Sequence, residues 1–431
     1  MGYWLAVFFC LLVSLSLSVS DEWPQWRGPD RDGVWRETGI LERFETSTLT
    51  PKWQTEISAG YSGPTVAGGR VYVSDRVELP EEVERILCFD WKNGQKIWEH
   101  QYPASYQGVN YPAGPRAAVT VHQGFAYALG ATGRLSCLDA ESGDLKWDVD
   151  GQSAYRVRMP VWGLTASPLV EGDNVIVVMG GENACVLAFN RKTGAESWSA
   201  LEDRANYSAP IVIDQAGQRV VVVWTGERVV GLNAGSGAVV WAYDWRAKRM
   251  PLGVATPVLH QDFLFFTGFY DGATLLQLNR EKETVSKVWQ RQGRSERSTE
   301  AIHSIISTPL IKEDFIFGVD SYGELRCLEL GTGDRVWEDQ RAVPRARWAT
   351  IHFVEHGERV WMFNEKGDLT IAKLSGEGYE AVSTAHLIDP TPKQLRQRLV
   401  VWAHPAFAYR HVFARNDEKL ICVDLSASNE L

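Results

Sequence analysis

The sequence predicts an all-β fold, a single β-propeller of eight four-stranded blades, with seven blades as the alternative. Three observations lead to this fold. Trp residues recur every 43 to 51 positions, the same order of short β-type runs and turns precedes each one, and the first has no blade in front of it. Self-similarity at a fixed period of this length is typical of propellers and solenoids. Four short strands per unit, with turn residues between them, favour the propeller.

The repeat has a fixed spacing, in which an acidic or amide residue is followed by Gly after four positions and by Trp after four more. Five copies keep it: Asp90-Gly94-Trp98, Asp139-Gly143-Trp147, Asn190-Gly194-Trp198, Asn233-Gly237-Trp241 and Glu329-Gly333-Trp337. A sixth copy, from Asn279 to Trp289, carries a two-residue insertion. The Gly-containing turns are hairpin signals. Because a repeated residue serves the repeated fold, we predict that the repeat Trp residues dock between neighbouring blades. They are Trp53, Trp98, Trp147, Trp198, Trp241, Trp289 and Trp337.

The two ends of the repeat region indicate how the ring closes. The last repeat stops after Leu420-Ile421-Cys422-Val423-Asp424, before its Trp strand, whereas the strand around Trp53 stands alone at the start. We therefore expect the N-terminal strand to complete the C-terminal blade, which removes two exposed sheet edges. A degenerate repeat at residues 360–371 lacks its Gly and Trp. Counting it gives eight blades; if it is an insertion, the number is seven.

The N-terminus has the pattern of a targeting segment. An apolar stretch from Leu5 to Val19 ends in small residues before Asp21, as a secretory signal peptide does. An uncleaved anchor is the alternative, but about 15 apolar residues fall short of the roughly 20 that span a bilayer. We expect an exported protein of the periplasm, cell envelope or exterior, without membrane insertion after cleavage. Residues 1–20 then form the signal peptide, 21–48 an N-terminal extension, 49–425 the propeller and 426–431 a short tail.

The cysteines are predicted to be buried free thiols. Export favours disulfides, but Cys88, Cys137, Cys327 and Cys422 occupy the same repeat position in four different blades. Equivalent positions in separate blades lie too far apart for the roughly 4.4–6.8 Å Cα separation of a disulfide. Cys10 lacks a lipoprotein setting, because two Phe residues precede it where small residues are expected.

The repeat resembles a known family. Its Leu-x-Cys-Leu-Asp-Ala run before a Ser-Gly or Thr-Gly turn and a Trp is similar to the pyrroloquinoline-quinone-type (PQQ-like) β-propeller repeat. That family includes quinoprotein alcohol dehydrogenases and the propeller lipoprotein of the outer-membrane β-barrel assembly machinery. The segment from Trp23 to Gly33 further resembles the start of exported propeller proteins from planctomycete-type bacteria. The resemblance implies a propeller over residues 50–425, and it implies either a catalyst or a scaffold, since one fold hosts both.

The dehydrogenase branch implies a quinone, a calcium ion held by Glu, Asn and Asp, and an adjacent Cys-Cys disulfide. This sequence has no Cys-Cys pair. Asp30-Arg31-Asp32-Gly33 is half of a calcium loop and is interpreted as a turn, and His352/His356 is not interpreted as a metal site. We therefore predict no enzyme activity, no cofactor and no metal, with a PQQ-dependent dehydrogenase as the alternative.

The connections between blades differ most from copy to copy, and they must all emerge on one face. They contain 16 Lys and Arg against 12 Asp and Glu, although the whole chain has a formal charge of −10. That net charge argues against nucleic-acid binding. We expect this face of a monomer to bind an unknown envelope protein or an anionic or polar ligand, with acidic polysaccharide as a further alternative. The candidate residues are Tyr61, Arg116, Trp162, Tyr207, Arg249, Arg294, Arg297, His303, Arg345, Arg347, Trp348 and Trp402.

Overall fold

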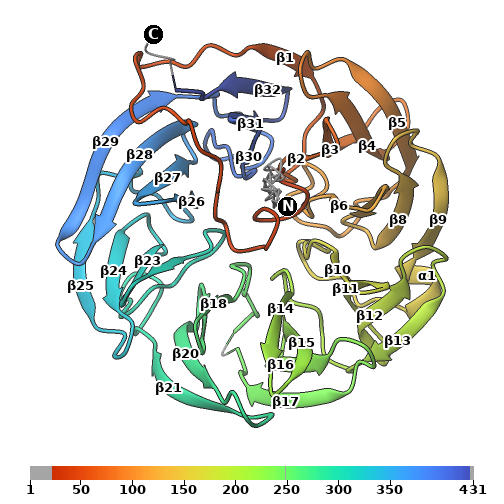
Figure 1. Cartoon of the computed structure of the whole chain (residues 1–431). Helices are drawn as coiled ribbons and strands as arrows, with labels where there is room; N and C mark the ends of the chain where they lie inside the picture. The colour runs from red at the N-terminus through yellow and green to blue at the C-terminus, as the bar shows by residue number, and fades with distance from the viewer. Residues whose placement is uncertain (1–21, 248, 428–431) are drawn as a thin grey trace, which may run out of the picture.

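In the computed structural model, which describes residues 22–247 and 249–427, the chain forms eight four-stranded sheets around a central channel (Figure 1). Strands pair antiparallel within each sheet, and successive sheets follow one another around the ring, so each sheet is a propeller blade. The eight-bladed prediction is confirmed. The degenerate repeat is not an insertion, because it forms a complete sheet of its own.

The blades are numbered along the chain, and each is given from its inner to its outer strand. Blade 1 consists of β2 (Thr65–Ala67), β3 (Arg70–Val77), β4 (Val83–Asp90) and β5 (Lys96–Pro103). Blade 2 consists of β6 (Thr120–His122), β7 (Phe125–Leu129), β8 (Arg134–Asp139) and β9 (Leu145–Asp150). Blade 3 consists of β10 (Leu169–Glu171), β11 (Asn174–Gly181), β12 (Ala184–Asn190) and β13 (Glu196–Ala200). Blade 4 consists of β14 (Ile211–Gln215), β15 (Gln218–Trp224), β16 (Arg228–Asn233) and β17 (Val239–Asp244).

The second half of the chain repeats this order and ends with the closing sheet. Blade 5 consists of β18 (Val258–His260), β19 (Phe263–Gly268), β20 (Gly272–Leu278) and β21 (Val285–Arg291). Blade 6 consists of β22 (Leu310–Lys312), β23 (Phe315–Val319), β24 (Leu325–Glu329) and β25 (Arg335–Asp339). Blade 7 consists of β26 (Ile351–His356), β27 (Arg359–Asn364), β28 (Asp368–Ser375) and β29 (Gly378–His386). Blade 8 consists of β30 (Ala406–Ala408), β31 (His411–Arg415), β32 (Lys419–Asp424) and β1 (Trp53–Glu56).

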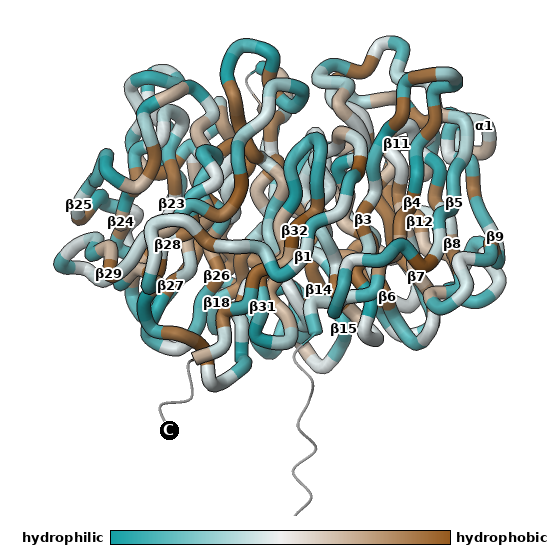
Figure 2. Tube along the Cα trace, turned by 90° about the horizontal axis from the view of Figure 1, so that it is seen from above, coloured by the Kyte–Doolittle hydropathy of each residue, from teal (hydrophilic) through white to brown (hydrophobic). Residues whose placement is uncertain are grey.

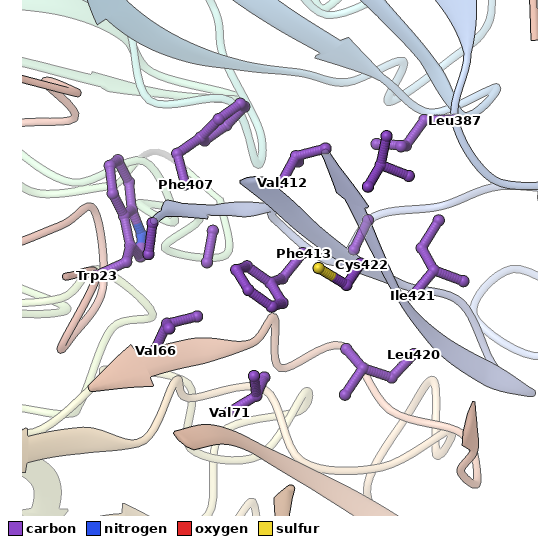
Figure 3. Close-up of a cluster of buried hydrophobic side chains, with 14 of the residues drawn as sticks. Trp23, Val66, Val71, Leu387, Phe407, Val412, Phe413, Leu420, Ile421 and Cys422 are labelled. Atoms are coloured by element: carbon purple, nitrogen blue, oxygen red, sulfur yellow. The ribbon is translucent and has the colours of Figure 1, made fainter. Parts of the chain in front are cut away.

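Blade 8 closes the ring as the sequence predicts. The N-terminal β1 pairs antiparallel with the C-terminal β32, so that Trp53 lies opposite Cys422 and Glu56 opposite Lys419. The apolar cluster behind this pairing joins blade 8 to blade 1 (Figure 3), with Val412 and Phe413 packed in the same buried cluster as Val66 and Val71. Burial of this cluster holds the two ends of the repeat array together.

The repeat Gly and Trp residues form the contact between neighbouring blades. Gly143 of blade 2 has a φ of +78°, and a Cβ at this position would lie 2.6 Å from Cδ2 of Trp98 in blade 1. Only Gly therefore fits under the indole. The Trp98 Nε1–H donates to the Ala140 carbonyl of blade 2 at 3.2 Å. The same Gly–Trp packing recurs at Gly94 with Trp53, Gly194 with Trp147, Gly237 with Trp198 and Gly333 with Trp289.

The copy with the insertion departs from this pattern. Blade 5 lacks the repeat Gly, and Trp241 of blade 4 donates to Gln215 Oε1 of its own blade at 2.7 Å. The Gln215 Nε2 group donates in turn to the Asn279 and Thr284 carbonyls of blade 5. A side-chain amide thus replaces the direct contact between indole and turn.

The face that carries the long connections is the one with α1 (Gly151–Tyr155), at the top of Figure 2. This five-residue helix lies between β9 and β10, and Asp150 caps it by accepting from the Gln152 and Ser153 N–H groups. No other helix occurs in the part of the chain that the structure describes. None of the described segments is a helix long and apolar enough to cross a membrane. The predicted signal peptide, residues 1–20, lies outside the described residues.

The N-terminal extension passes across the centre of the ring (Figure 1). We call residues 23–35 the plug. Trp23 exchanges two backbone hydrogen bonds with Val66 of blade 1, and Trp35 and Gly33 do the same with Glu355 of blade 7. Asp30-Arg31-Asp32-Gly33 is a turn, as predicted, since the Gly33 N–H donates to the Arg27 carbonyl. Residues after the plug pass over blade 8 and pair with the edge of β29, where the Leu49 N–H donates to the His386 carbonyl.

Candidate functional site

One repeat position brings a side chain from most blades to the mouth of the channel. In seven blades it lies four residues before the inner strand. These residues are Tyr61, Arg116, Thr165, Tyr207, Val254, Ile306 and Trp402, and all of them line the same cavity. In blade 7 the inner strand begins at Ile351, and the residue that lines the cavity is Trp348, just before that strand. The cavity volume is about 130 Å³.

Aromatic rings make most of the cavity wall, and we call the cavity the aromatic chamber. Its aromatic residues are Trp26, Tyr61, Tyr111, Trp162, Tyr207, Trp348 and Trp402. Trp162 precedes blade 3 and Trp348 precedes blade 7, on opposite sides of the ring, yet their ring centroids are 5.9 Å apart. Trp162 also packs against Tyr207 at 5.1 Å and Tyr111 at 5.9 Å. These rings therefore meet across the channel mouth.

The plug forms the floor of the chamber. Trp26 lines the cavity from below, and its Nε1–H donates to Thr256 Oγ1 of blade 5 at 2.8 Å. Arg31 is buried and donates to the carbonyls of Ser167, Pro168 and Pro210, at the entrances to blades 3 and 4. Burial lowers the pKa of Arg31 to about 9. Together with the backbone pairing to blades 1 and 7, these bonds fix the floor to blades on several sides of the ring.

Trp348 adopts an unusual backbone conformation beside the cavity. Its φ is +67°, in the left-handed region that a large side chain rarely adopts. The Trp348 N–H donates to the Ser321 carbonyl at 2.9 Å, which holds this conformation. Such strain is typical of functional positions.

In the part of the chain that the structure describes, the one charged side chain that lines the chamber is Arg116, and backbone carbonyls accept its hydrogen bonds. Arg116 lies over the Tyr61 ring at 4.9 Å and donates to the Gly114, Asn110 and Tyr111 carbonyls. Among the described residues that line the chamber there is no Asp or Glu. The Trp402 Nε1–H does donate to Glu365 Oε2 at 3.0 Å, but that carboxylate is already paired with Arg398.

Two histidines lie at the base of the chamber, and both are neutral. His352 Nε2 lies 2.9 Å from the Trp402 carbonyl. Burial lowers the pKa of His352 to about 4. The pKa of His404 falls to about 3, through burial and then the nearby His352. A neutral imidazole brings no charge into this apolar site. Each neutral ring still has one N–H donor and one bare acceptor nitrogen.

The predicted candidates divide into three groups. Six of them line the chamber: Tyr61, Arg116, Trp162, Tyr207, Trp348 and Trp402. Two stack on aromatic rings at its rim, Arg347 over Trp348 at 4.4 Å and Arg249 over Tyr270 at 5.5 Å. Four lie elsewhere: Arg294, Arg297, Arg345 and His303.

His303 is not a surface group, which corrects its inclusion among binding-face residues. Its side chain is buried, its backbone N–H donates to Asp320 Oδ1, and its Nε2 accepts from the Gly293 N–H. The ring therefore orders the connection between blades 5 and 6. A His at a strand entrance gives no sequence signal that separates this role from ligand binding.

Several arginines of the loop face are held in ion pairs. Arg345 lies 3.5 Å from Glu324, and Arg347 pairs with both oxygens of Glu296 at 2.8 Å. Arg341 pairs with Asp339 in the same way. Counting charges along the connections could not reveal these pairs, because a count does not show which charges lie side by side. Glu296 and Asp339 come from the counted connections themselves, whereas Glu324 comes from a turn of blade 6.

Sequence reasoning missed five residues of the chamber. Tyr111, Thr256, His352, His404 and Trp26 were not among the candidates, although all five line the cavity. Thr256 and His404 lie two residues before their inner strands, so alignment of the blades on those strands could have found them. Nothing in the repeat points to Trp26, which precedes the first blade.

The described residues contain no group of three or more His, Cys, Asp or Glu side chains arranged to hold a metal ion. The five described cysteines are buried and free, as the repeat position predicts, and Cys10 lies outside the described residues. Burial raises the pKa of Cys88, Cys137, Cys327 and Cys422 to about 12 in each case.

Comparison with known proteins agrees with the fold. The family model described as "Outer membrane protein assembly factor BamB" matches residues 36–148 and 82–339, which together cover more than half of the chain. The chain belongs to the PQQ-like β-propeller repeat family. Within it, the outer membrane protein assembly factor BamB of Shewanella oneidensis is 25% identical over 227 residues, 52% of this chain and 56% of that protein. The chain thus spans little more than half the length of this relative.

Solved structures of both branches share the fold. BamB from Moraxella catarrhalis superposes with a TM-score of 0.56 at 16% identity, over 88% of this chain and 99% of that chain. Quinohemoprotein alcohol dehydrogenase from Comamonas testosteroni superposes with a TM-score of 0.66 at 12% identity, over 95% of this chain and 81% of that chain. At these identities the likeness concerns the fold alone.

The residues of the chamber do not fit the quinone and calcium arrangement of the dehydrogenase branch. The described lining offers no carboxylate for calcium, and the described cysteines are unpaired. A volume of about 130 Å³ is also below the roughly 300 Å³ at which pockets for cofactor-sized ligands begin. The lining is suited instead to holding one small, largely apolar group.

Proposed function

We propose that the protein is a non-catalytic binding scaffold of the cell envelope, and that a partner protein docks on the face around the aromatic chamber. The observation that carries this proposal is the chamber itself. Large aromatic side chains from connections on opposite sides of the ring meet at one apolar cavity. Aromatic and Arg side chains around an apolar pocket are the usual composition of an interface hot spot.

The relatives support an envelope role. Several of the matching curated proteins, including that of Shewanella oneidensis, are named as outer membrane protein assembly factors. Export, predicted from residues 1–20, would place this protein in the same compartment. The ion pairs of the loop face support a protein partner rather than an acidic polysaccharide, since Arg345 and Arg347 already have carboxylate partners.

Capture from cell envelopes tests the proposal. The full chain serves as bait, and captured proteins are compared quantitatively between the wild type and Trp162→Ala. Trp91→Ala is the matched control, because Trp91 packs against Tyr409 outside the chamber. We expect Trp162→Ala to lose the specific partner and Trp91→Ala to keep it. Equal capture by all three proteins would show that the chamber face is not the docking site.

A second measurement tests the non-catalytic part. Purified protein is incubated with pyrroloquinoline quinone and calcium, and dye-linked oxidation of alcohols and sugars is followed. We expect no oxidation above the rate without protein. Sustained turnover would refute the scaffold proposal in favour of a dehydrogenase.

A further inference from the structure

Arg116 is the feature of the aromatic chamber that points to a ligand. Its guanidinium lies over the Tyr61 ring at 4.9 Å, and its two Nη atoms donate to the carbonyls of Gly114, Asn110 and Tyr111. These contacts hold the guanidinium in one position at the cavity wall. Its Nε–H donates to none of the described residues, so this donor remains for a ligand or for water.

The positive charge of Arg116 has no carboxylate partner among the described residues. Its three hydrogen-bond acceptors are all backbone carbonyls, which carry no net charge. Glu84, a buried acid of blade 1, accepts instead from the hydroxyls of Tyr102 and Tyr106, and burial raises the pKa of this carboxyl. The guanidinium therefore lacks a counter-ion, and an anionic ligand would supply one.

The charge of Arg116 acts inside the cavity as well as at its wall. Burial raises the pKa of Tyr61 and of Tyr207, and the positive charge of Arg116 opposes the rise at both. Tyr61 precedes blade 1 and Tyr207 precedes blade 4, so the field reaches more than one side of the chamber. Since the two histidines of the lining are neutral, this potential attracts an anion and repels an ammonium group.

The aromatic walls decide which kind of anion fits. The face of an aromatic ring carries negative potential, so it favours apolar or positively polarised groups over anionic oxygens. A phosphate or sulfate ion is polar on all sides and would leave these walls without a partner. A carboxylate on an apolar body satisfies both parts of the site, because the carboxylate accepts from the guanidinium while the body lies against the rings.

The shape of the chamber limits the apolar body. At about 130 Å³ the cavity approaches the roughly 150 Å³ of an apolar protein cavity that binds benzene, so one six-membered ring fits. Trp162, Trp348 and Tyr111 meet across the mouth with ring centroids 5.8–5.9 Å apart, and Trp26 forms the floor. A small molecule enclosed between floor and mouth suits this arrangement better than a side chain that must enter from a partner protein.

We propose that the chamber binds the anion of a small monocarboxylic acid whose apolar body is about one six-membered ring, with the carboxylate on Arg116 and the body between Trp26 and the rings of the mouth. This proposal goes beyond the proposed function, because the ligand is a small molecule and requires no partner protein.

Benzoate and benzamide test the proposal on the full chain, because they share a shape and differ in charge. Their dissociation constants are measured by isothermal titration calorimetry at low salt. A hydrogen bond to a charged group is stronger than one between neutral groups, so we expect benzoate to bind at least about tenfold more tightly, which is about 1.4 kcal/mol. The ratio should shrink as salt is added. Acetate, which lacks the apolar body, should bind at least about tenfold more weakly than benzoate.

Three variants locate the charge that selects the anion. In Arg116→Gln the affinity for benzoate should fall to that for benzamide, while benzamide binds as to the wild type. Arg116→Lys keeps the positive charge and should still bind benzoate more tightly than benzamide. Arg297→Gln is the matched control, because Arg297 stacks on Tyr322 at 5.8 Å on the same face but outside the chamber. It should keep the wild-type ratio, and circular dichroism checks that each variant is folded.

Several results would overturn the assignment. They are equal binding of benzoate and benzamide to the wild type, no saturable binding of benzoate, tighter binding of benzylammonium, or an equal loss in Arg116→Gln and Arg297→Gln. If Arg116→Gln also loses benzamide, the preference retained by Arg116→Lys decides for the charge, and its loss decides against it. Tighter binding of N-acetylphenylalanine than of benzoate would assign the site to the end of a protein chain instead. Partner capture by Trp162→Ala is a separate readout, so the docking face stands or falls independently.

Discussion

Replacement of Gly143 by Ala should destabilise the protein more than the same change at Gly124. Both glycines belong to turns of blade 2 and have positive φ, +78° and +81°. A Cβ at Gly143 would lie 2.6 Å from Cδ2 and 2.8 Å from Cγ of Trp98, whereas a Cβ at Gly124 would have nothing within 4 Å. The pair therefore separates the contribution of backbone strain from that of the indole contact.

The magnitudes follow from these distances. The left-handed conformation alone costs a non-Gly residue about 1–2 kcal/mol, which is the loss expected for Gly124→Ala. Gly143→Ala adds overpacking against an indole that is held by its hydrogen bond to Ala140, and such overpacking costs about 1–3 kcal/mol. The free energy of unfolding should therefore fall by about 1–3 kcal/mol more in Gly143→Ala than in Gly124→Ala.

Urea denaturation followed by far-ultraviolet circular dichroism measures both losses, with the slope m compared to check that the unfolded states are alike. A double-mutant cycle locates the effect: in a Trp98→Ala background, Gly143→Ala should cost no more than Gly124→Ala. If the two glycine variants lose equal stability in the wild-type background, the indole contact does not restrict this position. The reasoning would also fail if the excess loss survived removal of Trp98.

Three further predictions concern charge and burial. Partial burial lowers the pKa of His386, but hydrogen bonds to the carboxylates on either side outweigh it and leave the pKa above its ordinary value. Its stabilisation is then full below the unfolded pKa of about 6.5 and is lost as the pH rises through the folded pKa. The stability gap between wild type and His386→Gln, from urea midpoints, should thus be larger at about pH 5.5 than at about pH 8.5, and a pH-independent gap would contradict this. Arg31→Leu should lower the free energy of unfolding by at least about 2 kcal/mol, because it leaves buried carbonyls without donors. The exposed ion-pair variant Arg36→Leu should stay within about 1 kcal/mol, and similar losses in both would argue against a plug fixed by Arg31. None of the five described thiols should react with a chromogenic disulfide in the native protein, and all five should react in guanidinium; rapid labelling of native protein would be inconsistent with their burial.

Part of the candidate site could be predicted from the sequence. Tyr61, Tyr207 and Trp402 were found because aromatic residues stand out at a position where the blades otherwise resemble one another. The arginines were harder to interpret, because the effect of a charge depends on its neighbours in space. Arg116 lines the chamber, whereas Arg345 lies beside Glu324 and outside the chamber.

The sequence by itself determined the propeller fold, the order of its repeats, the closure of the ring by β1 and the burial of the cysteines, whereas the structure decided between eight blades and seven. The sequence could do so because each of these features depends on contacts within a blade or between consecutive blades, which recur with the repeat and leave the same residues at the same spacing. The repeat Gly under the repeat Trp is the clearest case. Only the tertiary structure decided the chamber. Its walls take one side chain from each of several blades, its roof joins Trp162 to Trp348 across the ring, and its floor is Trp26, from a segment without any repeat. Contacts of this kind join residues far apart in the chain, and no periodic pattern records them.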